Sequence, residues 1–215
     1  MSQIRTVPAG LAIALCLFTA PSWAAPKGFQ EAIVTEAVNQ VDVVSGTAQR
    51  PARVNQVIRG TEIIRTGQRS RAELRFPDNT IARVGANAAF AFRTDTRGFE
   101  FQKGSILFHS PKGLGGGQIR TAAATASVLG TTIIVCATPN GGFKVLVLEG
   151  KAKVQTPGGR TLVLGAGQMN FILPGGSQSA ALTFRLNQQV GSSGLVNGFG
   201  SLLASLEKIQ QAIER

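Results

Sequence analysis

The 215-residue sequence has no tyrosine, one tryptophan, one histidine and two cysteines. A single histidine excludes the multi-histidine sites that commonly hold zinc and other transition metals. Acidic residues are also scarce, with 11 Asp and Glu against 22 Lys and Arg, so the side chains for an acid-base pair or a nucleophile triad are few. We therefore expect no catalytic residues, no cofactor and no metal site.

The first 24 residues have the layout of a secretory signal peptide. Arg5 precedes an apolar stretch from about residue 11 to residue 20, and cleavage would follow Ser22-Trp23-Ala24. Because the stretch is about half of the roughly 20 residues needed to span a bilayer, an uncleaved anchor is the less favoured alternative. We expect an exported protein, in the periplasm or at the cell surface, without a transmembrane helix in its mature form.

Three features could carry chemistry but have simpler structural interpretations: a cysteine, the single histidine and a glycine-rich segment. Cys16 leaves with the signal peptide, so Cys136 has no internal disulfide partner, and its apolar run predicts a small buried side chain. An intermolecular disulfide or a reactive thiol at Cys136 is the alternative. His109 has no carboxylate beside it in sequence, which favours a surface or half-buried strand residue over a catalytic base. The glycines of residues 112–118 lack the spacing of a phosphate-binding loop and predict a flexible connection.

Short runs of Val, Ile, Thr and Phe dominate the rest of the chain, broken about every eight to twelve residues by Gly, Pro, Asn or Asp. The segment RAELRF alternates, which predicts Ala72, Leu74 and Phe76 in a core and their charged neighbours, Glu73 among them, in water. These signals indicate an all-β fold. The recurring glycine corners favour a roll or solenoid of short strands, with a two-sheet β-sandwich as the alternative.

The order of the strand segments from about Val41 to Gln168 resembles the FecR domain, an exported β domain of bacteria. The resemblance is carried by TGQRSRAELRFPDNTIARVGANA, FQKGSILFH, IRTAAATASVLGTTIIV and FKVLVLEGKAKVQTPGGRTLVLGAGQ. Asn79 replaces the glycine usual in the family's strand-turn phrase, and asparagine also tolerates the left-handed conformation. The matched positions are Leu74, Phe76, Asp78, Asn79 and Thr80, then Val128, Gly130 and Thr131, then Val145, Val147 and Gly150, and finally Gly167 and Gln168.

The resemblance implies an exported module that binds another molecule. Signalling members of the family have a cytoplasmic segment that handles a sigma factor before a membrane helix, whereas about ten residues precede the apolar stretch here. We therefore expect a non-catalytic module for a partner protein or an anionic envelope polymer, in signalling or envelope assembly, without anti-sigma activity. The alternative is a structural protein that associates with itself through its C-terminal helix or exposed strand edges.

Arginine is concentrated between residues 50 and 97, where ten arginines and no lysine accompany four acidic residues. Outward-facing arginines could form a basic surface that holds carboxylates or phosphates through forked contacts, and a merely solvated face is the alternative. Nucleic acid is not an expected ligand, because the chain is exported and its aromatic residues alternate as core residues do. The candidate surface consists of Arg59, Arg65, Arg69, Arg71, Arg75, Arg83 and Arg93.

Four parts are predicted after the signal peptide. Residues 25–40 form a lead-in strand, 41–185 the FecR-like β domain, 186–200 a Gly/Ser-rich joint and 201–215 an amphipathic helix. One face of this helix carries an apolar stripe, which predicts either a cap on the β domain or docking to a partner or a second copy. The stripe consists of Leu202, Leu206, Ile209 and Ile213.

Overall fold

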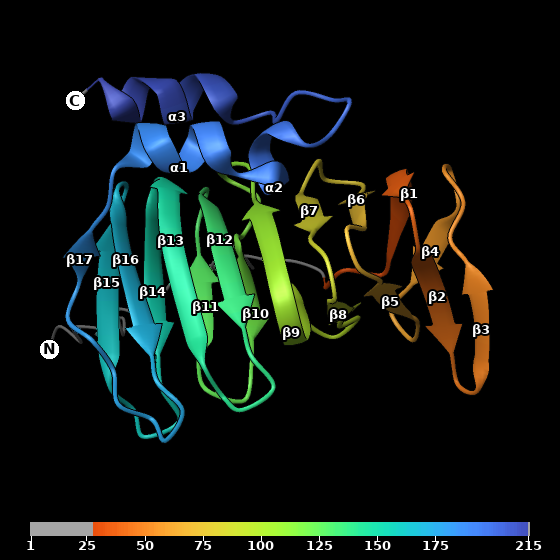
Figure 1. Cartoon of the computed structure of the whole chain (residues 1–215), viewed down its shortest axis with the longest axis horizontal. Helices are drawn as coiled ribbons and strands as arrows, with labels where there is room; N and C mark the ends of the chain where they lie inside the picture. Colours follow the sequence, from red (N-terminus) through yellow and green to blue (C-terminus); the bar gives the residue numbers. More distant parts are fainter. Residues whose placement is uncertain (1–27, 215) are drawn as a thin grey trace, which may run out of the picture.

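In the computed structural model, described for residues 28–214, the chain forms 17 strands and three short helices (Figure 1). The all-β fold with a C-terminal helix is therefore confirmed, whereas the predicted signal peptide lies outside the described residues. Strand pairing joins the strands into one open sheet that lies in two layers. Within residues 28–214 each helix has eight residues or fewer, too short to span a bilayer.

The first layer contains nine strands, each paired with the next. In spatial order they are β4 (Val57–Arg59), β1 (Glu31–Val38), β6 (Arg71–Arg75), β7 (Ile81–Val84), β9 (Gly98–His109), β12 (Thr132–Ala137), β13 (Phe143–Glu149), β16 (Gln168–Ile172) and β17 (Leu182–Thr183). The predicted lead-in segment thus supplies β1, which lies between two strands of this layer and is part of the domain.

The second layer also contains nine strands in the described part of the chain. In spatial order they are β3 (Ala48–Pro51), β2 (Val41–Ser45), β5 (Ile63–Thr66), β8 (Ala89–Phe92), β9, β10 (Gly117–Arg120), β11 (Thr125–Val128), β14 (Lys151–Gln155) and β15 (Thr161–Gly165). Strand β9 is the fifth of nine in both layers, so the layers are continuous with each other and are not two separate sheets.

Strand β9 passes from one layer to the other at Gly104. Residues before it pair with β8 and β10, and residues from Gly104 onward pair with β7 and β12. The φ of Gly104 is +99°, and a Cβ there would lie 2.6 Å from the Cβ of Ala88. Only glycine meets both conditions, so this residue permits the two layers to share a strand.

The inner core, which we define as the apolar side chains between the two layers, is organised around phenylalanine. The ring centroid of Phe99 lies 4.8 Å from that of Phe108, 5.0 Å from Phe29, 5.1 Å from Phe90 and 5.5 Å from Phe76. All five rings are buried. Such stacked and edge-to-face pairs add to the stabilisation that burial of apolar area already provides.

The turn between β6 and β7 is closed by local hydrogen bonds. The backbone N–H of Phe76 donates to Thr80 O, and the N–H of Thr80 donates to the Asp78 carboxylate. Asn79 has a φ of +61°, which is the left-handed conformation that asparagine tolerates in place of glycine. The turn sets the register in which β6 faces β7.

The C-terminal strap, defined as residues 186–213, covers part of the outer face of the first layer. It contains α1 (Leu186–Ser192), α2 (Gly194–Asn197) and α3 (Leu206–Ile213), which lie across one end of β16, β13, β12 and β9 in Figure 1. The predicted joint at residues 186–200 is therefore wrong, because Leu186, Val190 and Leu195 are buried and drive this segment onto the sheet. The last helix begins five residues later than predicted.

A second group of buried apolar residues, the outer core, lies between the strap and the first layer. The strands contribute Leu107, Ile134, Leu146 and Leu148, and the strap contributes Leu186, Val190, Leu195, Val196, Phe199, Leu203 and Ile209. Strands β9, β12 and β13 are thus covered on both faces, which explains their nearly continuous apolar sequences.

Candidate binding site on the outer face of the first layer

The structure separates the seven arginines of the predicted basic surface. Arg65 and Arg93 belong to the second layer and to the turn that follows β8, so the seven do not form one continuous stripe. The exposed members are Arg59, Arg65, Arg69 and Arg75, the half-buried members are Arg71 and Arg93, and the buried member is Arg83.

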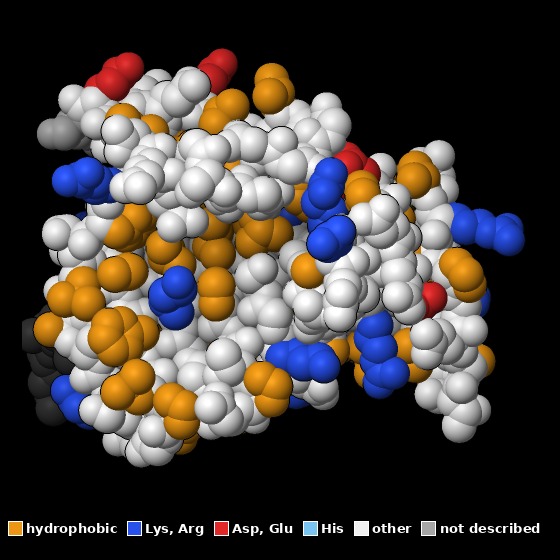
Figure 2. Space-filling model, viewed as in Figure 1, with side chains coloured by type: hydrophobic (Ala, Val, Ile, Leu, Met, Phe, Trp, Pro, Cys, Tyr) orange, Lys and Arg blue, Asp and Glu red, His pale blue; other side chains and the backbone are white. Residues whose placement is uncertain are grey.

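Three of these arginines lie on β6 and in the turn before it, and Arg71 and Arg75 flank the buried Glu73 on the outer face. Arg71 and Arg75 alternate with the core residues Ala72 and Leu74, so they face away from the inner core, and Arg69 precedes them. Figure 2 shows Lys and Arg side chains over this part of the first layer, beside the helices. We call Arg69, Arg71 and Arg75 the arginine cluster.

The buried member, Arg83, forms an ion pair with Glu73 across the β6–β7 hairpin. Glu73 faces Arg83 in the strand register, and Arg83 Nε lies 2.7 Å from Glu73 Oε2. Their side chains are 0% and 1% exposed for Arg83 and Glu73. The predictions of a solvent-facing Glu73 and a surface Arg83 are therefore wrong, because the C-terminal strap covers this part of the outer face.

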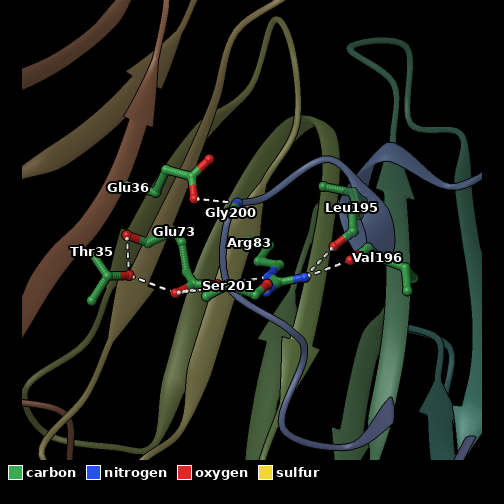
Figure 3. Close-up of polar contacts among 8 residues, drawn as sticks. All are labelled: Thr35, Glu36, Glu73, Arg83, Leu195, Val196, Gly200 and Ser201. Carbon is green, nitrogen blue, oxygen red and sulfur yellow. Dashed lines mark hydrogen bonds and ion pairs between the residues drawn. The ribbon is translucent and has the colours of Figure 1, made fainter.

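Arg83 binds the strap through its remaining N–H groups (Figure 3). Nη1 donates to the carbonyl oxygens of Val196 at 2.8 Å and Leu195 at 3.3 Å, and Nη2 donates to that of Ser201 at 2.7 Å. The guanidinium carbon also lies 4.5 Å from the ring centroid of Phe199. One buried cation therefore holds the α2 end and the following turn on the sheet.

Two carboxylates complete this attachment. Glu73 accepts hydrogen bonds from the hydroxyl groups of Thr35 at 2.7 Å and Ser201 at 3.2 Å. Glu36 on β1 accepts a hydrogen bond from the backbone N–H of Gly200 at 2.8 Å. The strap is thus held by residues of β1, β6 and β7 that lie more than one hundred positions earlier in the chain.

A groove of about 440 Å³ opens beside this attachment, between the start of β6 and helices α1 and α2. Arg69 and Arg71 line one side, and buried Ile134 and Leu195 supply apolar surface. No acidic residue lines the groove within the described chain. Its volume falls in the range of about 300–1,000 Å³ that is usual for small-molecule sites.

Cys136 also lines the groove. Cys136 is half-buried on β12 and packs against the outer core, so it is more accessible than the small buried residue predicted from its apolar run. Burial raises the pKa of the thiol, and the nearby Lys144 ammonium opposes that effect.

His109 lies away from the groove, at the end of β9. It is 5% exposed, so the prediction of a surface or half-buried residue is wrong. Its Nδ1 lies 3.0 Å from the Thr132 hydroxyl, which donates to the Ser205 hydroxyl at 2.7 Å. Burial, and secondarily Lys208, lowers the pKa of His109 to about 4. Within residues 28–214 no group of three His, Cys, Asp or Glu side chains could hold a metal ion.

The predicted apolar stripe divides between the inside and the outside of the fold. Ile209 is fully buried in the outer core, and Leu206 packs against it. Ile213 is 37% exposed. Leu202 precedes the helix and is 83% exposed, so its placement on the helical stripe is wrong. Helix α3 therefore contacts the sheet through Leu206 and Ile209, whereas its C-terminal end is partly exposed.

Sequence reasoning missed the pairing of Glu73 with Arg83, although one signal was present. The two residues stand five positions on either side of Asp78 in the predicted turn, so a tight hairpin places them opposite each other. Their burial could not be inferred in this way, because the covering residues 195–201 are far away in sequence.

Comparisons with known proteins agree with this fold. Residues 62–153 match the model of the FecR protein family. Two crystal structures of a candidate anti-sigma factor from Parabacteroides distasonis ATCC 8503 are similar in fold, with TM-scores of 0.54 and 0.53 and sequence identities of 19% and 18%. Each covers 63% of this chain, which spans 65% and 64% of their lengths. No curated protein sequence matches the chain.

Proposed function

We propose that this chain, whose residues 62–153 form a FecR domain, is an exported, non-catalytic binding module that recognises an acidic surface of a partner protein in a signalling pathway. The arginine cluster carries the recognition. The domain match supports a regulatory role, and the similar crystal structures are described as those of a candidate anti-sigma factor. An anionic envelope polymer is the second ligand that the same charges would suit.

The observation that supports this proposal is that the arginine cluster has no ion-pair partner in the described part of the chain. Three other arginines of the domain are occupied, since Arg50 pairs with Glu62, Arg93 with Asp95, and Arg97 with Asp78. Within residues 28–214 no carboxylate pairs with a member of the arginine cluster. Unpaired cations on one face attract an acidic partner and orient it.

The test is the binding of an acidic polypeptide, polyglutamate, to the Arg69→Gln/Arg71→Gln/Arg75→Gln variant. We expect the variant to bind more weakly than the wild type. We also expect its binding to depend less on salt, because salt screens exposed charges beyond about 8 Å at physiological ionic strength and the variant has three fewer charges to screen. The matched control, Lys151→Gln/Lys153→Gln/Arg160→Gln, removes three exposed cations from β14 and the turn that follows it, and should bind as the wild type does.

Equal weakening by both triple variants would show that only net charge matters, and would overturn the proposal. Equal binding by the arginine-cluster variant and the wild type would overturn it as well. An acidic polysaccharide measured in parallel distinguishes the two ligand classes. Stronger, cluster-dependent binding of the polysaccharide would assign the surface to an envelope polymer.

Self-assembly remains the second candidate, because several large apolar residues are exposed. Leu129 is 72% exposed, Val163 on the edge strand β15 is 61% exposed, and Leu202 is 83% exposed. Sedimentation velocity over a hundredfold range of concentration tests this candidate. A monomer throughout would favour the binding module, and a concentration-dependent oligomer that Leu202→Ala or Val163→Ala dissociates would favour assembly.

A further inference from the structure

We propose that the groove between β6 and helices α1 and α2 binds a small carboxylate that carries a short apolar chain. Arg69 and Arg71 would hold the carboxylate, and Ile134, Cys136 and Leu195 would contact the chain. The inference extends the proposed function, because Arg69 and Arg71 belong to the arginine cluster, but it concerns a different ligand and a different readout.

The anionic end of the ligand is inferred from the arginines of the groove. Arg69 is exposed and Arg71 is half-buried, and neither has a carboxylate partner within residues 28–214. The Nε of Arg71 is buried without a hydrogen-bond partner in the described part of the chain. The Arg71 guanidinium is therefore not saturated by acceptors of the fold, which favours a ligand that supplies an acceptor to its other N–H groups.

The apolar end is inferred from the opposite wall. Ile134 and Leu195 belong to the outer core and still reach the groove surface, and Cys136 lies beside them. Figure 2 shows basic and hydrophobic side chains along the same border of the helices. Ser105 and Gln189 add polar groups that could orient the ligand. The combination of two cations with an apolar wall matches an amphipathic anion.

An inorganic anion would leave the apolar wall in contact with water, and a neutral apolar molecule would leave the arginines without an acceptor. A carboxylate joined to a short chain satisfies both parts, and arginine binds carboxylates through parallel N–H contacts. This chemistry is available from a free fatty acid or from the C-terminal residue of a peptide. We therefore propose a carboxylate with a short apolar chain as the ligand, and the experiment distinguishes a fatty acid from a peptide C-terminus as its source.

Cys136 supplies a direct readout of groove occupancy. The full chain would be treated with a maleimide, and the modification rate of the peptide that contains Cys136 followed by mass spectrometry. Hexanoate tests the free carboxylate, and Gly-Gly-Leu with a free carboxyl group tests the peptide terminus. Hexanol, Gly-Gly-Leu amide and inorganic phosphate are the matched controls, since each lacks one of the two required features.

We expect hexanoate, Gly-Gly-Leu or both to slow modification of Cys136 in a saturable manner, while the three controls leave the rate unchanged. Protection by hexanol equal to that by hexanoate would overturn the anionic part of the proposal. Protection by phosphate equal to that by hexanoate would overturn the apolar part. No protection by any of the compounds would overturn the site itself.

Two single variants separate this site from the wider surface. Arg71→Gln should raise the concentration of hexanoate or Gly-Gly-Leu for half-protection about tenfold, the loss expected for one charged hydrogen bond. Arg75→Gln, which does not line the groove, should leave it unchanged. Polyglutamate binding would be measured on the same proteins. If Arg75→Gln weakens polyglutamate binding and no carboxylate protects Cys136, the groove proposal fails and the proposed function stands.

Discussion

The inner and outer cores of this protein are built differently. The inner core lies between strands that follow one another closely in sequence, and phenylalanine rings fill its centre. The outer core joins the first layer to a strap that comes from the far end of the chain, and buried polar pairs accompany its apolar residues. Where strand pairing already sets the register, apolar contacts suffice. Where a distant segment must be positioned, hydrogen-bonded charges fix its place.

The largest effect is expected from the inner core. Replacing Phe99 by Ala should lower the free energy of unfolding by about 3–5 kcal/mol, because it removes a fully buried ring and leaves a cavity. Urea denaturation measures this change, with Leu202→Ala as the exposed control, expected within about 0.5 kcal/mol of the wild type. A loss at Phe99 no greater than that of the control would contradict the central role of this ring.

A loss of similar size, about 3–5 kcal/mol, is expected for Arg83→Met, because Glu73 would remain buried without its partner. Hydrogen exchange should show that the amides of α1, α2 and α3 lose protection before those of β12 and β13. The double variant Glu73→Met/Arg83→Met should recover part of the loss, since no charge is then left buried. Simultaneous loss of protection in helices and strands would show that the two cores unfold as one unit.

The burial of His109 should make the free energy of unfolding depend on pH. Its folded pKa of about 4 lies below the usual value near 6.5, so the unfolded chain takes up a proton first as the pH falls. Stability should therefore decline between about pH 6.5 and pH 4, by at most about 3 kcal/mol. The carboxylates are common to the wild type and His109→Asn, so the difference between their unfolding curves isolates this group. A difference in stability between the wild type and His109→Asn that does not change with pH would contradict the lowered pKa of His109.

The smallest effect is expected in the β6–β7 turn, which sets the pairing of Glu73 with Arg83. Asn79 has a positive φ, so Asn79→Ala should destabilise the fold by about 1–2 kcal/mol, whereas Asn79→Gly should be nearly neutral. Thermal unfolding of both variants distinguishes conformational strain from the loss of the amide side chain. Equal destabilisation by Ala and Gly would assign the effect to the side chain.

Local sequence patterns were sufficient to predict the strands and their turns. The alternation around Leu74 and Phe76 correctly identified core positions, because strand periodicity is a property of neighbouring residues. The left-handed conformation of Asn79 was likewise predictable from the residue type. These features do not depend on distant segments, which is why the FecR-like part of the fold could be inferred.

The outer face could not be predicted in the same way. Glu73 and Arg83 look like solvent-facing residues of exposed strands until residues 195–201 cover them. The glycines and serines near Gly194 indicated a joint, yet the intervening Val190 and Leu195 are buried. The groove was also beyond prediction, because it exists only where the strap meets β6.

The position of the strap has a consequence for how the length of this architecture could vary. A hairpin inserted beyond β3 or β15 would lengthen the layers without changing any pairing near β9. The strap, in contrast, reaches from Glu36 on β1 to the contact of α3 with β13, so its length matches the width of the intervening strands. The number of strands between β7 and β13 is therefore matched to the number of residues in the strap. An added strand there would separate Ser201 from Arg83 unless the strap were longer by a corresponding amount.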